Sequence, residues 1–230
     1  RKSTRPITLI DSMDNLSKPV HSDVVLNSTF TIIRTWGKNS FEKSSRFSEF
    51  DIINQLKPIK TYNERQVVKK PNIVIFIIES MGREYWGELN KNKNIKNFKS
   101  FTPFLDSLSK HSLIFPNAFA TSRKSIHGMP SVLAGVPSFE IAYTSSYYSR
   151  QKLESMVSVS NNLGYDTSFL HGAKNGSMGF QGFANALGYN NYYGRDEFNN
   201  DDEYDGFWGI WDEPFLQFSK SILDNKNEPF

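Results

Sequence analysis

A run of six apolar residues, 73–78 (IVIFII), sets the fold class of this chain of 230 residues. Five of the six are β-branched, and the run stands between Pro71 and the polar pair Glu79-Ser80. Six residues are far fewer than the ~20 that cross a bilayer, but they are the length of a strand. An unbroken apolar run, unlike an alternating one, is typical of a central parallel strand covered on both faces. The sequence therefore predicts an α/β fold.

The rest of the chain after Pro71 alternates between strand and helix patterns. Thr102-Pro103 is a helix start, with Thr as N-cap and Pro at the first helical position. We expect strands at residues 72–80, 112–120 and 167–170, and helices from residue 103 and at residues 125–133, 151–163, 180–187 and 212–223. Such alternation predicts an α/β sandwich with a mainly parallel central sheet.

Residues 1–70 differ in charge and pattern, so we expect two parts: an extended N-terminal arm (1–70) and an α/β domain (71–230). The arm holds 13 Lys and Arg against 7 Asp and Glu. Residues 24–26 and 30–33 are short β-prone runs, and residues 47–56 suit a short helix. Residues 195–213 carry eight acids and one Arg. In one interpretation, residues 1–70 are a basic linker and residues 195–213 are a solvated acidic loop. In the other, the basic segment lies near a membrane surface.

Composition removes several functional classes. The chain has no Cys, which excludes disulfides, Cys-ligated zinc and a thiolate nucleophile. A net charge of +3 is too small to indicate a nucleic-acid partner. The 19 Phe and 10 Tyr supply large side chains for a core, so the chain is not of a disordered type.

Three polar residues follow predicted strands, where α/β sheets bind ligands. Glu79 ends the first strand, and it either meets a divalent cation or forms a salt bridge with Arg83. Ser125 opens a helix, and it is either a nucleophile or a simple N-cap. His171 ends the third strand, and it either binds substrate or is hydrogen-bonded in the core. If the strands are parallel neighbours, the three residues meet at one edge of the sheet.

Basic residues surround Ser125. Arg123 and Lys124 precede it, and they would add positive charge to a helix N-terminus that already attracts anions. His127, two residues into the helix, is expected to face solvent or substrate. The four His have no metal-ligand spacing among them.

Together these motifs resemble the lipoteichoic acid synthase-like family of the sulfatase and alkaline phosphatase superfamily. The resemblance covers most of the chain and is carried, in order, by segments 72–80 (NIVIFIIES), 102–106 (TPFLD), 115–120 (FPNAFA), 123–130 (RKSIHGMP), 171–172 (HG) and 208–215 (WGIWDEPF). It implies an alkaline phosphatase/sulfatase-like sandwich that is truncated at its C-terminus. Residues 5–7 and 26–33 are similar to the stretch that joins this family's membrane helices to its catalytic domain.

The resemblance also implies roles. Glu79 would be a metal ligand, Ser125 the nucleophile and a second contact to the metal, and His171, Arg123, Lys124 and His127 the substrate-binding residues. The reaction would move a phospho-head-group, of phosphoglycerol or phosphoethanolamine type, from a phospholipid to a glycan or lipid acceptor. Manganese is the implied metal, with magnesium or zinc as substitutes. The implied location is the extracytoplasmic face of a bacterial cytoplasmic membrane, held there by helices before Arg1.

Three alternatives stay open. The family's Asp-His-Gly metal motif is absent here, so we expect the remaining metal ligands to lie beyond Phe230. If they do not exist, the chain is a non-catalytic binding domain. A hydrolase would differ only in using water as the acceptor. A strict sulfatase would need a C/S-x-P-x-R motif, and Ser125 is followed by Ile-His-Gly-Met.

Overall fold

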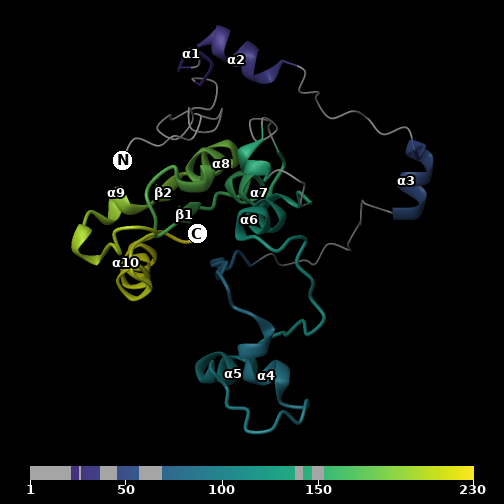
Figure 1. The fold of residues 1–230 in the computed structure, drawn as a ribbon, viewed down its shortest axis with the longest axis vertical. Helices are drawn as coiled ribbons and strands as arrows, with labels where there is room; N and C mark the ends of the chain where they lie inside the picture. The colour runs from purple at the N-terminus through teal and green to yellow at the C-terminus, as the bar shows by residue number, and fades with distance from the viewer. Residues whose placement is uncertain (1–21, 26, 37–45, 57–68, 138–141, 147–152) are drawn as a thin grey trace.

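A computed structural model describes residues 22–25, 27–36, 46–56, 69–137, 142–146 and 153–230 (Figure 1). Its α-helices are α1 (Ser22–Val25), α2 (Ser28–Thr35), α3 (Glu49–Leu56), α4 (Gly87–Asn90), α5 (Pro103–Ser109), α6 (Ser125–Ala134), α7 (Met156–Asn162), α8 (Phe180–Leu187), α9 (Arg195–Phe198) and α10 (Asp212–Asp224). Single 3-10 turns lie at Arg83–Tyr85, Tyr143–Ser145, Ser177–Gly179 and Asp201–Glu203. The strands are β1 (Ser168–Leu170) and β2 (Asn191–Tyr193).

The two strands form a parallel pair that α8 connects. Ser168 lies opposite Asn191, and Leu170 lies opposite Tyr193. The backbone N–H of His171 extends the ladder by donating to the Tyr193 carbonyl over 2.9 Å. This parallel pairing with helical connections confirms the predicted α/β class. The sequence predicted β1, but β2 was not foreseen.

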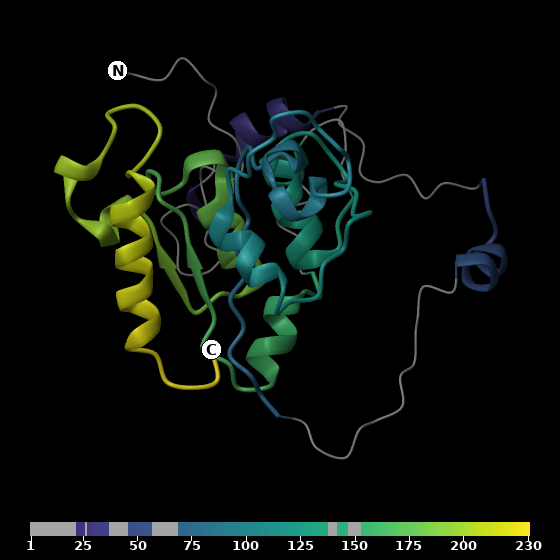
Figure 2. The same cartoon turned by 90° about the horizontal axis from the view of Figure 1, so that it is seen from below.

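Helices cover both faces of this pair (Figure 2). On one face Phe169 stacks on Tyr192 and meets Phe180 of α8 edge-on. On the other face Tyr193 contacts Phe218 of α10. Successive side chains of a strand point to opposite sides, so Tyr192 and Tyr193 bring one aromatic ring to each helical layer.

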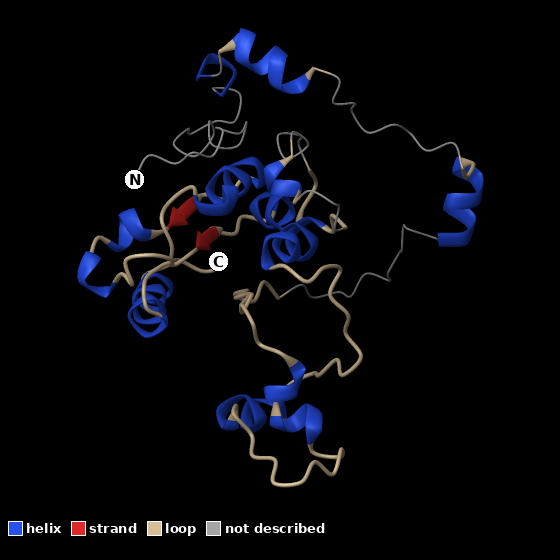
Figure 3. Cartoon of the chain, viewed as in Figure 1, coloured by secondary structure: helices blue, strands red, loops and turns tan. Residues whose placement is uncertain are grey.

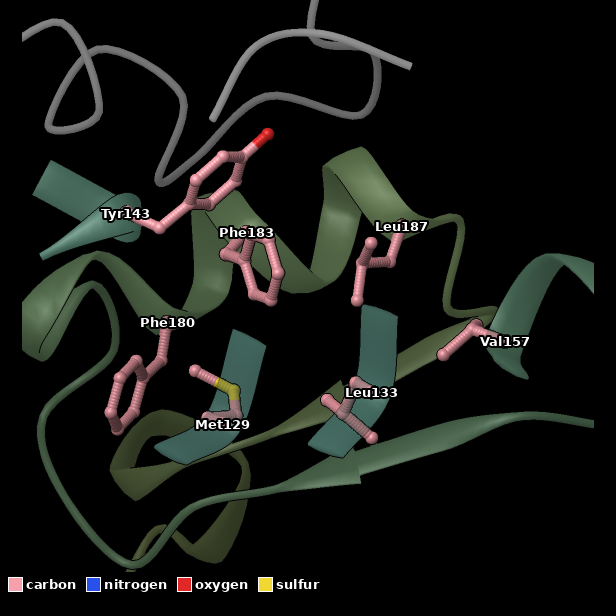
Figure 4. Packing of buried hydrophobic residues seen from close by; sticks show 7 residues of the cluster. All are labelled: Met129, Leu133, Tyr143, Val157, Phe180, Phe183 and Leu187. Atoms are coloured by element: carbon pink, nitrogen blue, oxygen red, sulfur yellow. The ribbon is translucent and has the colours of Figure 1, made fainter. Parts of the chain in front are cut away.

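The main core lies between α6, α7 and α8 (Figure 4). Phe183 is fully buried at its centre and meets Tyr143 edge-on with ring centroids 5.8 Å apart. The other buried members of the cluster are Met129, Leu133, Val157, Phe180 and Leu187. Burying side chains of this size contributes roughly 1.5–3 kcal/mol each, so this cluster is what holds α6 in place beside the strands.

The predicted helices are confirmed where they are described. Helix α8 spans the predicted residues and ends at Gly188, whose φ of +89° suits a glycine. Helix α7 begins at Met156, not at residue 151, because the Ser155 and Ser158 side chains each accept a hydrogen bond from the other's backbone N–H. Residues 151 and 152 lie outside the described part. The predicted helix at residues 47–56 forms as α3, from Glu49.

Four strand predictions are wrong. The described residues of segments 24–26 and 30–33 are helical, in α1 and α2. Residues 112–120 form turns and loop. Residues 72–80 have no ladder assignment, and the side chains at 73–78 are 42–68% exposed instead of covered.

Helices α4 and α5 pair with each other at the end of two long loops (Figure 3). Asp106 of α5 joins them, since its carboxylate accepts a hydrogen bond from the Glu88 backbone N–H over 2.9 Å. Among the described helices, none is long and apolar enough to cross a bilayer.

Candidate active site

One large cavity of about 740 Å³ lies among residues 73–77, helices α6, α7 and α10, and strand β1. Its lining is mostly apolar. Glu79, Ser125 and His171, the three residues that follow predicted strands, all belong to this lining. The three residues therefore line one cavity, although only one of the three expected strands forms a ladder.

Ser125 is the first residue of α6. Lys124 occupies the N-cap position, and the Ser125 hydroxyl makes no hydrogen bond with another described residue. The alternative role of Ser125 as an N-cap is thereby excluded. The hydroxyl is half-buried and available to a ligand in the cavity.

Glu79 stands in a turn after the extended segment. The next residue, Ser80, has a φ of +56°, which reverses the chain away from the extended direction. Glu79 is exposed and pairs with no cation among the described residues. Arg83, its expected salt-bridge partner, donates instead to the Pro116 carbonyl over 2.6 Å. The Glu79 carboxylate is therefore free to bind a cation.

His171 is held by aromatic rings. Its imidazole meets Phe180 edge-on at 4.9 Å, and its Nδ1 lies 3.5 Å from the Tyr192 hydroxyl. Burial lowers the pKa of His171 to about 4, because a charged imidazolium loses hydration there. His171 is therefore neutral at pH 7 and can act on a ligand through a hydrogen bond, not through charge.

The backbone around His171 is fixed by two later segments. The Gly172 carbonyl accepts from the Ile210 N–H over 2.7 Å, and the Ala173 carbonyl accepts from the Arg195 N–H over 3.0 Å. A Cβ on Gly209 would lie 2.4 Å from the Gly172 oxygen, so only glycine allows this approach. The segment 208–215 that carries part of the resemblance thus supports the His-Gly turn.

The other predicted substrate-binding residues do not line the cavity. Arg123 and Lys124 are exposed beside α6. His127 is only 8% exposed, so the expectation that it faces solvent is wrong. Helix α6 also buries Met129 and Leu133, which lie on a different side of the helix from His127. A substrate role for these three residues stays a prediction.

Tyr192 lies beside the candidate site, and its position there was not predicted from the sequence. Its hydroxyl faces His171 only because β2 pairs with β1 in a register that places Phe169 opposite Tyr192. The signal that could have found it is the β-prone pair Tyr192-Tyr193 after Gly188.

Glu79 and Ser125 supply oxygen donors of the type that hard divalent cations prefer. The part of the chain that the structure describes contains no group of three or more His, Asp or Glu that could hold a metal ion. These donors fit a divalent cation in kind, and a metal site at Glu79 and Ser125 stays a prediction.

Comparison with known proteins places this arrangement in a family. Over 71% of its length, the chain resembles a protein of the alkaline phosphatase superfamily from Vibrio parahaemolyticus, with 23% identity and a TM-score of 0.61. Over 68% of its length, it resembles the lipoteichoic acid synthase LtaP from Listeria monocytogenes, with 24% identity and a TM-score of 0.58. The chain spans 39% and 37% of those two structures, so the likeness shows a shared fold.

The family itself is shown by the sequence match. The Sulfatase family model matches residues 71–230, a range that includes Glu79, Ser125 and His171. The chain therefore belongs to the sulfatase family.

Proposed function

We propose that this domain serves metal-dependent transfer of a phospho-head-group, of phosphoglycerol or phosphoethanolamine type, from a phospholipid to a glycan or lipid acceptor. Ser125 is the nucleophile. The observation that carries the proposal is the unengaged Ser125 hydroxyl, which faces a cavity also lined by Glu79 and His171. The resemblance to the lipoteichoic acid synthase-like family supports the choice of a phosphodiester substrate.

The reaction is a double displacement. Ser125 Oγ forms a bond to phosphorus, the bond from phosphorus to the diacylglycerol oxygen breaks, and that oxygen leaves with a proton. In the second step an acceptor hydroxyl attacks phosphorus, loses its proton, and releases the serine. His171 is neutral at pH 7, so it can accept or donate a hydrogen bond at the rim in either step.

Helix α6 supports the negative phosphoryl group. Its first N–H groups, at Ser125 and Ile126, precede the first bond within the helix, which His127 N–H donates to the Lys124 carbonyl. Such N–H groups and the helix dipole favour an anion at this end. Arg123 and Lys124 add positive charge nearby, although they are outside the cavity.

A divalent cation, with manganese favoured by the resemblance and magnesium or zinc as substitutes, would be held by Glu79 and Ser125. It would supply charge stabilisation and a lower pKa for the serine hydroxyl. The proposed location is the extracytoplasmic face of a bacterial cytoplasmic membrane, where phospholipid donors and glycan acceptors are both present. Its partners would be that membrane and those two substrates.

The test is mass spectrometry of the intact protein after incubation with vesicles of phosphatidylglycerol or phosphatidylethanolamine and Mn²⁺. We expect a covalent adduct on Ser125 whose added mass identifies the transferred group. Ser125→Thr should keep the adduct because it keeps the hydroxyl, and Ser125→Ala should lose it with an unchanged circular dichroism spectrum. An adduct of equal yield in the Ala variant would refute the assignment, and no adduct in any variant would favour a non-catalytic binding domain.

A hydrolase is the second candidate, supported by the match to the Sulfatase family. The same serine intermediate would then pass its group to water. The residues 126–129 after Ser125 lack the Pro and Arg of the motif that directs formylglycine formation, so the serine acts unmodified in this candidate too. Product analysis with and without a glycolipid acceptor separates the two: a transferase forms a new phosphodiester, whereas a hydrolase releases the free phosphorylated head group.

A further inference from the structure

The connection between α4 and α5 is a lysine-rich loop, residues 91–101. It carries four lysines and no acidic residue, at positions 91, 93, 96 and 99, although the net charge of the whole chain is only +3. Lys91 forms an ion pair with Glu88 of α4. The other three lysines are exposed and pair with no carboxylate among the described residues. The loop therefore presents three positive charges that nothing nearby in the chain neutralises.

Backbone hydrogen bonds fold the lysine-rich loop into turns. The Lys93 N–H donates to the Asn90 carbonyl over 3.0 Å, and the Phe98 N–H donates to the Ile95 carbonyl over 3.2 Å. Between these turns Asn94 has a φ of +48°, a conformation that asparagine adopts more readily than most residues. Figure 3 shows the loop beyond α4 and α5, on the side of the helix pair that faces away from the strands. The charges are thus held on a surface that a large partner can reach.

Apolar side chains stand among these lysines. Ile95 is 49% exposed between two of them, and Phe101 is 72% exposed two residues after the last. The Phe101 ring meets Tyr85 edge-on with centroids 5.9 Å apart, so it is held in this exposed position. A soluble polyphosphate would use only the charges. A bilayer surface would use the charges at its head groups and the apolar side chains just below them.

The acidic residues nearest to the lysine-rich loop are engaged or lie outside it. Glu88 is the ion-pair partner of Lys91. Asp106 of α5 accepts a hydrogen bond from the Glu88 N–H and is half-buried between the two helices. Glu84 precedes α4, so the whole of that helix separates it from the loop in the chain. These acids therefore leave the positive charge of the loop in place.

We infer that the lysine-rich loop is a docking surface for the head groups of an anionic phospholipid bilayer. The inference rests on the proposed function, which makes a phospholipid the substrate, and it adds the surface by which the protein approaches that substrate. Lys93, Lys96 and Lys99 lie among the lipid phosphates in this arrangement. Ile95 and Phe101 enter the interface between head groups and acyl chains, while the apolar stems of the lysines cover its edge.

Co-sedimentation with vesicles tests the charges. We expect the chain to bind vesicles of phosphatidylglycerol and phosphatidylcholine in equal parts, and not vesicles of phosphatidylcholine alone. The triple change K93Q/K96Q/K99Q should weaken binding at least about tenfold, because each lysine near an anionic surface contributes to the attraction. The control K38Q/K43Q/K60Q makes the same change in net charge within residues 1–70 and should keep most of the binding. An equal loss in both triple variants would show a general effect of net charge and overturn the inference.

A fluorescent label tests the apolar contact. The chain has no Cys, so a single introduced thiol can carry a polarity-sensitive fluorophore. At Ile95→Cys the emission should shift to the blue on phosphatidylglycerol vesicles, and at Asn162→Cys, an exposed residue at the end of α7, it should not. If the label at position 95 stays unshifted while K93Q/K96Q/K99Q abolishes binding to soluble polyphosphate, the partner is a polyanion and not a membrane. Vesicle binding needs no turnover, and Ser125→Ala should leave it unchanged, so the docking surface and the proposed transfer reaction can fail independently.

Discussion

At the scale of single residues, the narrowest constraint on the site is a contact between two glycines. Gly209 approaches the Gly172 carbonyl so closely that no Cβ fits between them, and Gly172 itself packs against the Phe215 ring. Because Gly172 follows His171 directly, the position of the imidazole depends on a segment nearly forty residues later in the chain.

Gly209→Ala should therefore lower the free energy of unfolding by about 1–3 kcal/mol, the usual cost of overpacking a rigid contact. Gly128→Ala is the matched control, because nothing lies within 4 Å of a Cβ added there, and Ala favours the interior of α6 by up to ~1 kcal/mol. Urea denaturation measures both. Equal stability of the two variants would show that the Gly209 contact relaxes without cost.

His171 gives a pH prediction. Its pKa is lowered to about 4 in the folded chain and is about 6.5 in the unfolded chain. As pH falls below 6.5, the unfolded state takes up a proton that the folded state refuses, so stability falls and continues to fall until about pH 4. The loss from this group is up to ~3 kcal/mol. His171→Gln should flatten the dependence of unfolding free energy on pH between 4 and 6.5, and an NMR titration of the ring should give the low pKa directly.

At the scale of elements, the sequence predicted helices far better than strands. A helix closes its hydrogen bonds within itself, so local signals such as Thr102-Pro103 and Gly188 locate its ends. A strand needs a neighbour, and the β-prone residues 112–120 find none in the described chain. The pair Tyr192-Tyr193, overlooked in the sequence, becomes β2 because α8 returns it to the side of β1.

The candidate site, like the fold, could be predicted from the sequence only in part. Glu79, Ser125 and His171 were expected to lie together because each follows a strand-like segment, and all three line one cavity. The expectation that His127 faces solvent was wrong, since the burial of a side chain on α6 depends on tertiary contacts that spacing alone did not provide. The neutrality of His171 arises from burial that no local pattern reveals.

The cap of α7 offers a test at this scale. Ser155→Ala removes the hydroxyl that accepts the Ser158 N–H at 3.1 Å, and it should lower the free energy of unfolding by roughly 1 kcal/mol. Ser155→Thr keeps an acceptor at the same position and should recover most of that loss. Thermal unfolding followed by circular dichroism measures both. A Thr variant as unstable as the Ala variant would mean that the packing of this buried side chain, not the cap, sets the effect.

At the scale of the whole molecule, an ordered core on α6, α7 and α8 adjoins a cavity whose other wall is exposed. The family match begins at residue 71, where the predicted catalytic part begins, and the division at residue 70 stays a prediction. The core can therefore position Ser125 at the start of α6, while the described residues contain no group of three or more His, Asp or Glu that could hold a metal ion.

The affinity of the chain for a divalent cation should be low, because the described residues offer few metal ligands. We expect Mn²⁺ to bind the 230-residue chain only weakly, in the millimolar range, because one carboxylate and one hydroxyl are fewer ligands than a stable divalent site uses. Isothermal titration calorimetry measures the affinity, with Glu79→Gln as the variant and Glu84→Gln, a nearby exposed acid outside the cavity, as the control. Micromolar binding that Glu79→Gln leaves intact would place the metal elsewhere.

The exposed segment 73–78 also affects how the protein behaves in concentrated solution. Six consecutive apolar residues, mostly β-branched and with no charge or proline, have the composition of segments that stack into cross-β fibrils. Where such a segment keeps unpaired backbone groups, copies of the chain can pair edge to edge. Covering this segment is therefore a condition for colloidal stability, and selection for a chain that stays dispersed would act on residues 73–78.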